Sequence, residues 1–441
     1  MKKLLFAIAT IGVLFAACGK DKDAPKSEVE KLLDLPYSKL TPAQQKAKLE
    51  QESIDFLEEL RGLQNLPAID AIEHFNDLLD RHDPNVPSPL QQVSDIKEVF
   101  NLGNVTGVFT WNRTTNRWTE ETSTTELKFI FPATSTATTN NATLVFTSEN
   151  SGVTITETWE HWEWDYETWE YIITEIETVY YLPKAAKAVL TIGSKEEAVI
   201  EFGADYKSGE DVPIKAIYKM STGGYVYQTT VDKVGEEKIS MKLSRGNKML
   251  VSGVAKTTAK LGELEDLLLN GNDISDEDIY KRLGEADAYI KLMDNLVVAY
   301  KIETEKWARA MDAYWIWDDN KYDELRRLEW GSPQYWTLYK QYQKERVEKR
   351  VKILNDFMNA ALVSTKDNYK IADMVWVAER DNEYDWWYNY YYQQQVYYYN
   401  QVIYLKFNDN TLIAADVYFG DGFDRLIEKF EELLDGFGFG K

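Results

Sequence analysis

The sequence predicts an α+β fold in which a curved antiparallel β-sheet meander is packed with N-terminal helices, with a long αα-hairpin and a C-terminal helix in addition. Three observations indicate this fold. Apolar residues recur at helical spacing before residue 80, the apolar period becomes two from 107 to about 254, and helical patterns return after 261. So many strands joined by so few residues favour an antiparallel meander.

The first 17 residues have the pattern of a signal peptide. Lys2 and Lys3 precede an apolar run from 4 to 17, which ends in small residues. This run is shorter than the roughly 20 apolar residues that a membrane-spanning helix needs. We therefore expect residues 1–17 to be removed from the mature chain.

Cys18 follows this run and is the only cysteine in the chain. The segment Phe15-Ala16-Ala17-Cys18 resembles a bacterial lipobox, which implies lipidation of Cys18. Lys20-Asp21-Lys22-Asp23 resembles the signal that sends such lipoproteins to the cell surface. The resemblance implies a lipid-anchored protein of the outer membrane, at the cell surface or on the periplasmic face. The alternative is a cleaved secretory signal with an incidental cysteine.

Residues 18–35 are polar and charged, which predicts a flexible tether. Beyond it, Thr41 and Pro42 have the pattern of a helix start, and a second helix is expected from Pro67. A third, shorter helix is expected over 94–100.

The period-two region predicts a series of strands. A hairpin is expected over 108–119, followed by strands at 127–131 and 142–146 and by a long pair of strands over 153–181. Further short strands are expected between 188 and 254.

The clearest local signal in the chain is Trp330-Gly331-Ser332-Pro333, a glycine stop followed by a serine cap and a first-turn proline. It predicts an αα-hairpin with helices over 304–329 and 333–362. Antiparallel pairing would bring acidic residues of the first helix beside basic residues of the second, Asp318 near Lys344 and Asp312 near Arg350. We expect a single large domain over 36–441, with this hairpin as an insertion at about 303–365.

The part from Thr41 through Val254 resembles a family of Bacteroidota-type outer-membrane or surface lipoproteins of unknown function. The resemblance rests on the helix start Thr41-Pro42-Ala43-Gln44-Gln45-Lys46, the strand Gly107-Val108-Phe109-Thr110-Trp111-Asn112, Phe131-Pro132, Leu182-Pro183 and the turn Phe407-Asn408-Asp409-Asn410-Thr411. It implies helices laid on a curved antiparallel sheet, and it supplies no catalytic residues.

The net charge of −23 argues against nucleic acid as a partner, because both would be polyanions. The sequence contains no HExxH motif, no GxSxG motif and no glycine-rich phosphate loop before a helix. We therefore assign no catalytic residues, no metal ligands and no cofactor. The expected partners are the membrane, through the lipid at Cys18, and a glycan or a protein.

Two stretches combine aromatic residues with acids. One spans 158–171, and the other spans 384–404 with nine tyrosines and two tryptophans. Aromatic rings beside carboxylates are typical of sugar-binding surfaces, whereas the alternative is packing across strands. Because aromatics occupy consecutive positions, one strand face cannot bury them all. The candidate ligand-binding residues are Trp159, Trp162, Trp164, Tyr166, Trp169, Trp386, Trp387, Tyr390 and Tyr398.

Three functional classes remain open. The first is a non-enzymatic envelope lipoprotein that binds a partner or a glycan through an aromatic-rich sheet surface. The second is an outer-membrane lipid carrier or assembly factor with an apolar groove. The third is a glycoside hydrolase, which would need two carboxyls about 5 to 9 Å apart in a cleft.

Overall fold

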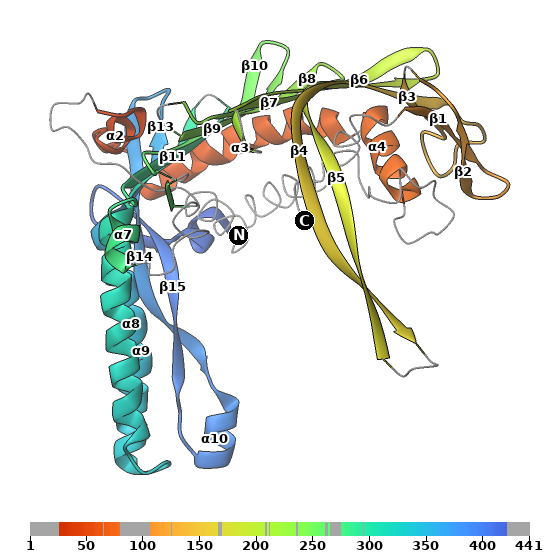
Figure 1. Cartoon of the computed structure of the whole chain (residues 1–441). Coiled ribbons are helices and arrows are strands. Elements are labelled where there is room, and N and C mark those ends of the chain that lie inside the picture. The colour runs from red at the N-terminus through yellow and green to blue at the C-terminus, as the bar shows by residue number, and fades with distance from the viewer. Residues whose placement is uncertain are drawn as a thin grey trace. The chain divides into compact units, whose positions relative to one another are not determined.

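The computed structural model describes residues 26–64, 66–79, 106–124, 126–165, 170–207, 210, 212–234, 237–260, 263–264, 275–293 and 295–420. The chain divides into two compact units, whereas the sequence predicts one large domain. Figure 1 shows the helices and strands with their labels. Unit 1 comprises Met1–Phe56, Glu236–Lys238 and Val251–Glu428, and unit 2 comprises Leu57–Gly235, Ile239–Leu250 and Lys429–Lys441. Cys18 and the signal peptide lie outside the described residues, as does the helix expected over 94–100.

The α+β class is confirmed, but the sheet is mixed rather than wholly antiparallel. The sixteen strands of the described residues form one hydrogen-bonded sheet. Each strand from β16 down to β3 neighbours the next one in sequence, and β1 and then β2 follow β3 at the end of the sheet. Strand β1 (Gly107–Asn112) forms the expected hairpin with β2 (Arg117–Glu121). Because β2 takes one edge of β1, strand β3 (Leu127–Phe131) pairs with the other edge, and this pairing is parallel. A period-two pattern does not reveal strand direction.

Unit 2 packs helix α4 (Pro67–Leu78), which begins at the expected proline, on one face of its strands. Phe75 is fully buried, and its ring centroid lies 5.0 Å from those of both Phe129 and Phe131. The indole Nε1 of Trp118 donates to the Leu78 carbonyl at 2.8 Å. The other strands are β4 (Ala142–Asp165), β5 (Glu170–Ile192), β6 (Lys195–Tyr206), β7 (Pro213–Thr222) and β8 (Tyr225–Asp232). Elements with residues in both units are α3 (Pro42–Gln64), β9 (Glu237–Arg245) and β10 (Lys248–Thr257).

Unit 1 contains an antiparallel run of strands from β10 to β16. Helices α8 and α9 are inserted between β12 and β13, which pair directly with each other, as expected for a hairpin insertion. The elements are α2 (Glu28–Leu33), α7 (Asp276–Tyr280), β11 (Glu285–Leu292), β12 (Leu296–Glu303), α8 (Thr304–Arg326), α9 (Pro333–Phe357), β13 (Met358–Ser364), β14 (Tyr369–Tyr384), α10 (Trp386–Tyr392), β15 (Tyr397–Lys406) and β16 (Leu412–Ala414).

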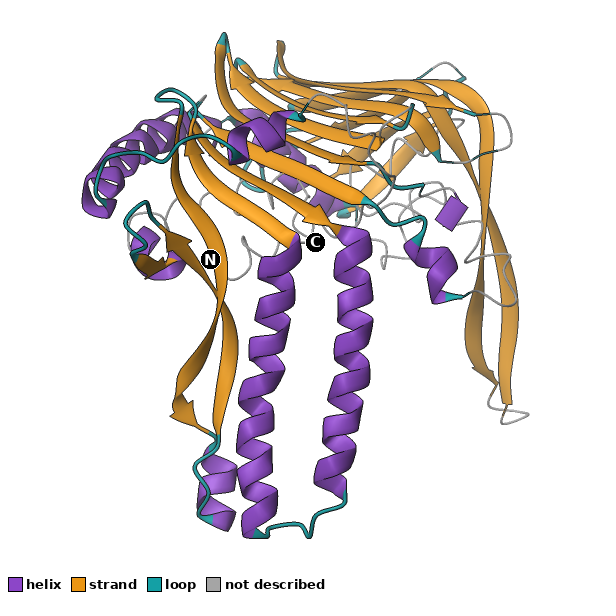
Figure 2. Ribbon diagram, turned by 90° about the vertical axis from the view of Figure 1, so that its left-hand side faces the viewer, coloured by secondary structure: helices purple, strands orange, loops and turns teal. Residues whose placement is uncertain are grey.

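Helices α8 and α9 run side by side, and the β14–β15 pair extends along α9 with α10 at its end (Figure 2). We call these three helices, together with the adjoining parts of β14 and β15, the tower. Its helices pair as predicted but in a shifted register, because Asp318 contacts Arg346 at 3.4 Å rather than Lys344. Lys344 instead lies 3.5 Å from Glu348 of its own helix.

The tower differs from the prediction in two places, the end of α9 and the secondary structure of the aromatic stretch. Helix α9 ends at Phe357 rather than at 362, because residues 358–364 form β13, which is hydrogen-bonded between β12 and β14. The aromatic stretch from 384 contains the helix α10 as well as a strand. The expectation of a sheet surface is therefore wrong for Trp386, Trp387 and Tyr390, which lie on a helix.

Helix α2 lies within the segment predicted as a flexible tether. Ser27 caps it through a capping box with Glu30. Val29 is buried against Val297 and Val363, and Lys301 lies 2.9 Å from Glu30. The helix is ordered because it covers an apolar part of β12 and β13 that the local sequence of 26–35 does not reveal.

Residues 415–420 are helical, and residues 421–441, which the expected C-terminal helix would include, lie outside the described residues. Tyr418 packs on Phe407 at 5.3 Å between ring centroids and donates to the Pro42 carbonyl at 3.2 Å. Among the helices of the described residues, none combines the length and the apolar character that crossing a bilayer requires.

Candidate functional site

The candidate site is the end of the tower, where α10 packs on the first turns of α9. Trp336 of α9 contacts Tyr388 and Tyr392 of α10, with 5.5 Å between ring centroids in each pair. Val396 is fully buried in the same cluster. This interlocked aromatic core holds α10 in place, although a seven-residue helix is too short to be stable alone.

The helical period divides the aromatic residues of α10 between two faces. Tyr388 and Tyr392, four residues apart, face α9 and are half-buried. The pairs Trp386 with Tyr390 and Trp387 with Tyr391 have the same spacing and point away from α9. Because one face is enough for packing, the remaining rings stay at the surface.

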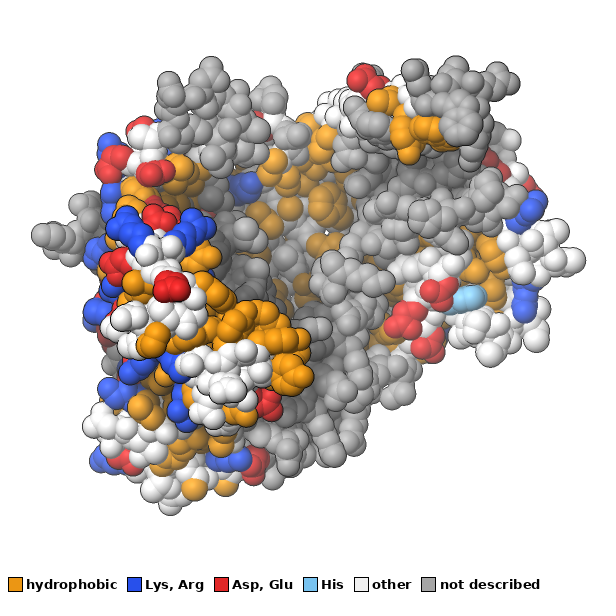
Figure 3. Space-filling model, turned by 90° about the horizontal axis from the view of Figure 1, so that it is seen from below, with side chains coloured by type: hydrophobic (Ala, Val, Ile, Leu, Met, Phe, Trp, Pro, Cys, Tyr) orange, Lys and Arg blue, Asp and Glu red, His pale blue; other side chains and the backbone are white. Residues whose placement is uncertain are grey.

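Five exposed aromatic residues form a continuous group that we call the aromatic tip. Trp386 is 68% exposed and Tyr390 is 72% exposed. Trp330, in the α8–α9 connection, joins them because its ring and that of Trp387 both pack on Tyr392. In Figure 3, hydrophobic side chains gather into one patch at this end of the tower. The aromatic tip consists of Trp330, Trp386, Trp387, Tyr390 and Tyr391.

Asp385 fixes the start of α10. Its carboxylate accepts hydrogen bonds from the backbone N–H groups of Trp387, at 2.8 Å, and Tyr388, at 3.3 Å, and from the Tyr398 hydroxyl. The hydrogen bond from Tyr398 and these two backbone N–H groups lower the pKa of Asp385. Burial and the hydrogen bond to this carboxylate raise the pKa of Tyr398 to about 12. At neutral pH a charged cap and a neutral phenol therefore coexist.

Few charged side chains lie around α10, although the Lys340 ammonium of α9 donates to Gln394 at 3.0 Å. Asp385 is the only charged residue from Tyr384 to Leu405. Exposed amide side chains, Gln393 and Gln395, flank α10 on its C-terminal side. The surface therefore offers apolar ring faces beside uncharged hydrogen-bonding groups.

The exposed rings do not form a flat platform. The planes of Trp386 and Tyr390 are tilted by 60°, those of Trp387 and Tyr391 by 51°, and those of Tyr390 and Tyr391 by 82°. Several coplanar rings would favour one extended ligand lying flat. The observed tilts instead give separate ring faces that point in different directions.

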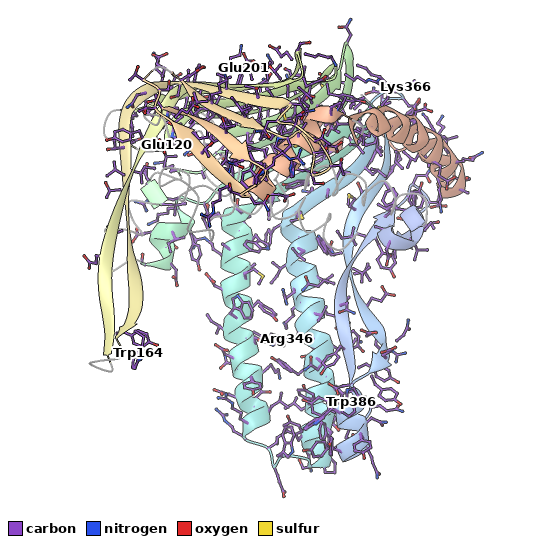
Figure 4. All side chains as sticks on the ribbon, turned by 90° about the vertical axis from the view of Figure 1, so that its right-hand side faces the viewer. Glu120, Trp164, Glu201, Arg346, Lys366 and Trp386 are labelled. Carbon is purple, nitrogen blue, oxygen red and sulfur yellow. The ribbon has the colours of Figure 1, made fainter. Side chains whose placement is uncertain are left out.

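The two predicted groups of site residues lie in different units, residues 384–404 in unit 1 and residues 158–171 in unit 2. Trp386, Trp387 and Tyr390 come together on α10, and Tyr398 of β15 supports them through Asp385. Trp164 is half-buried at the end of the β4–β5 pair in unit 2 (Figure 4), with its ring centroid 4.8 Å from that of Tyr171.

The remaining predicted residues belong to the same pair of strands or lie beyond the description. On β4, the backbones of Trp159 and Trp162 lie opposite Ile176 and Ile173. Tyr166 and Trp169 lie outside the described residues. Within the described ranges, no group of three or more His, Cys, Asp or Glu residues is arranged to hold a metal ion.

Sequence reasoning missed Trp330 and Tyr391 as surface residues, and Asp385 as the cap. The signals were present, because an aspartate directly before an aromatic run has the pattern of an N-cap. Trp330 adjoins the glycine of the recognised helix–helix turn. What the sequence does not show is that this turn and residues 385–392 meet in space.

Comparisons with protein-family models, with curated proteins and with solved structures find no match for this chain.

Proposed function

We propose that this protein is a non-enzymatic lipoprotein, lipid-anchored at Cys18 in the outer membrane and exposed at the cell surface, that binds a neutral glycan through the aromatic tip. The observation that carries the proposal is the exposure of five aromatic side chains at one end of the tower, on a support of buried aromatic residues. The lipobox-like segment and the resemblance to Bacteroidota-type lipoproteins supply the cellular setting.

Three properties favour a glycan as the ligand. The C–H faces of a pyranose pack well on indole and phenol rings, and tilted rings suit a ligand made of separate sugar units. The exposed amides of Gln393 and Gln395 can donate to and accept from sugar hydroxyls. Asp385 is the only charged residue in the segment from 384 to 405, which favours a neutral ligand over an ionic one.

Isothermal calorimetry tests the proposal by titrating neutral oligosaccharides into a soluble form of the chain that begins after Cys18. Trp386→Ala and Tyr390→Ala should each weaken binding about two- to tenfold, because a lost aromatic contact costs ~0.5 to 1.5 kcal/mol. Calorimetry is preferred because removing Trp386 also removes a fluorophore.

Trp315→Ala is the matched control, since Trp315 is also exposed but lies midway along α8. This variant should bind like the unaltered protein. Equal losses in the control and tip variants, or no heat from any neutral glycan, would count against the tip as a glycan site. A protein ligand that binds in a tip-dependent manner would replace the glycan in the proposal.

A further inference from the structure

The outer part of the β4–β5 pair in unit 2 is a ribbon of only two strands. Its register runs from Thr154 opposite Tyr181 to Asp165 opposite Glu170. Strand β3 reaches β4 only over 142–146, and β6 reaches β5 only over 185–192. In the described part of the chain, both edges of this ribbon therefore lack a further strand (Figure 1).

A fixed irregularity separates the ribbon from the sheet. The register shifts between Glu149 and Thr154, and Gly152 has a φ of +84°. Its N–H donates to the Asn150 side chain at 2.7 Å, while the Ser151 hydroxyl donates to the Leu182 carbonyl at 2.6 Å. Such bulges bend a strand and redirect the residues beyond the bend, so this irregularity sets where the ribbon leaves the sheet.

One face of the ribbon exposes large apolar side chains at alternate positions of β5. Tyr171 is 59% exposed and Ile173 is 49% exposed, and Val179 and Tyr181 continue the same face. An isolated two-stranded ribbon is at best marginally stable in water, and its open edges can pair with another strand. A partner that covers this face and one edge would stabilise it.

The charge of the ribbon indicates the kind of partner. Between Ser151 and Pro183 the sequence contains eight acidic residues and no lysine or arginine. With a net charge of −23, a second copy of this chain would be repelled, and so would an anionic membrane. We propose that the β4–β5 ribbon is a docking element for a basic protein segment, which adds to an edge of the ribbon as an extended strand.

This surface lies on unit 2, so the inference stands whether or not the aromatic tip of unit 1 binds a glycan. Basic side chains of the segment would pair with exposed Glu175, and they can also lie over the exposed rings of Tyr171 and Tyr181. Strand addition supplies main-chain hydrogen bonds, while the alternate apolar side chains set the register of the segment.

The first test uses the full-length protein in detergent and a fluorescent ten-residue peptide of alternating lysine and valine. Fluorescence anisotropy should detect binding that weakens with salt, and an alternating glutamate and valine peptide should not bind. Glu175→Lys, on the exposed ribbon face, should weaken binding about three- to tenfold. Glu196→Lys, an equal charge change at an exposed position of β6, should have little effect.

The second test replaces Val179 by a photo-crosslinking amino acid in cells, with exposed Ile316 of α8 as the control position. A crosslink to one protein with a basic segment, at 179 only and lost with Glu175→Lys, is the expected result. Failure to form an adduct, or an adduct with twice the mass of the chain, would overturn the proposal. Equal weakening of peptide binding by Glu175→Lys and Glu196→Lys would also overturn it.

Discussion

At the scale of single residues, Asp385 does more to shape the aromatic tip than any ring in it. Its carboxylate satisfies two of the backbone N–H groups that a helix start leaves unpaired, and it also binds the Tyr398 hydroxyl. Because the exposed rings of α10 depend on the orientation of this short helix, loss of the cap would change a surface that Asp385 itself does not form.

Asp385→Ala should therefore loosen α10 without unfolding the tower. Replacing an N-cap aspartate by alanine typically costs ~1 kcal/mol. We expect faster amide hydrogen exchange at Trp387 and Tyr388, measured by mass spectrometry, together with weaker binding at the tip. Asp385→Asn is the control, because asparagine caps about as well as aspartate. Equal exchange in both variants would show that the cap is not what holds the helix.

The pH dependence of the same cap has a definite sign. The pKa of Asp385 is lower in the folded protein than in the unfolded chain, so its contribution to stability is complete above the unfolded value of about 4. That contribution is lost as the pH falls through the lower, folded value. At neutral pH Asp385 stays charged, so small pH changes should not alter the protection of the Trp387 amide from hydrogen exchange. Protection of this amide should fall only in acid, where Asp385 becomes protonated.

At the scale of elements, the pairing of α8 with α9 depends on a buried polar contact. Asp318 is only 7% exposed, accepts from the Tyr342 hydroxyl at 2.9 Å and lies 3.4 Å from Arg346 Nε. Figure 4 labels Arg346 in α9, facing α8. The exposed ion pairs of the tower contribute little, whereas a buried group left without its partner is costly.

Asp318→Ala should destabilise the tower by ~1 to 3 kcal/mol, because it leaves the Tyr342 hydroxyl without its acceptor and removes the carboxylate that is ion-paired with Arg346. Urea unfolding followed by tryptophan fluorescence would measure the loss. Asp319→Ala is a close control, since the neighbouring carboxylate is exposed. A midpoint shift of the same size in both variants would mean that the contact does not fix the pairing of the helices.

Element starts were easier to predict than element ends. Ser332 and Pro333 specify the start of α9, and Gly331 adopts the positive φ of +82° that the preceding turn needs. The sequence predicts the end of α9 five residues too late, at 362 rather than at Phe357. Residues 358–364 become a strand through pairing with β12 and β14, and the local sequence does not reveal this pairing. Helix α10 was missed for a related reason, since its aromatic residues favour a strand when the cap at Asp385 is overlooked.

At the scale of the whole molecule, the sequence predicts the class of the fold, but not how the aromatic residues that it singles out are arranged in space. Trp386, Trp387 and Tyr390 were identified from composition, yet their exposure follows from how α10 packs on Trp336. The parallel β1–β3 pair and the burial of α2 likewise depend on contacts between segments far apart in sequence. Such contacts leave no local pattern.

The membrane attachment proposed for this protein depends on a single residue, which makes it the most direct prediction to test. The helices of the described residues offer no membrane-spanning segment, and the chain's net charge of −23 gives no attraction to anionic lipid. Acyl chains on Cys18 would supply ~0.8 kcal/mol for each buried methylene, so two or three chains are enough for stable anchoring.

Cys18→Ser should therefore move the protein from the membrane fraction to the soluble fraction of the cell envelope and abolish incorporation of labelled fatty acid. Trp386→Ala serves as the control, because it alters the tip and should leave the protein anchored. Protease added to intact cells should degrade the unaltered protein if the anchor places it at the surface, and should spare it on the periplasmic face. Retention of Cys18→Ser in washed membranes would refute the anchor.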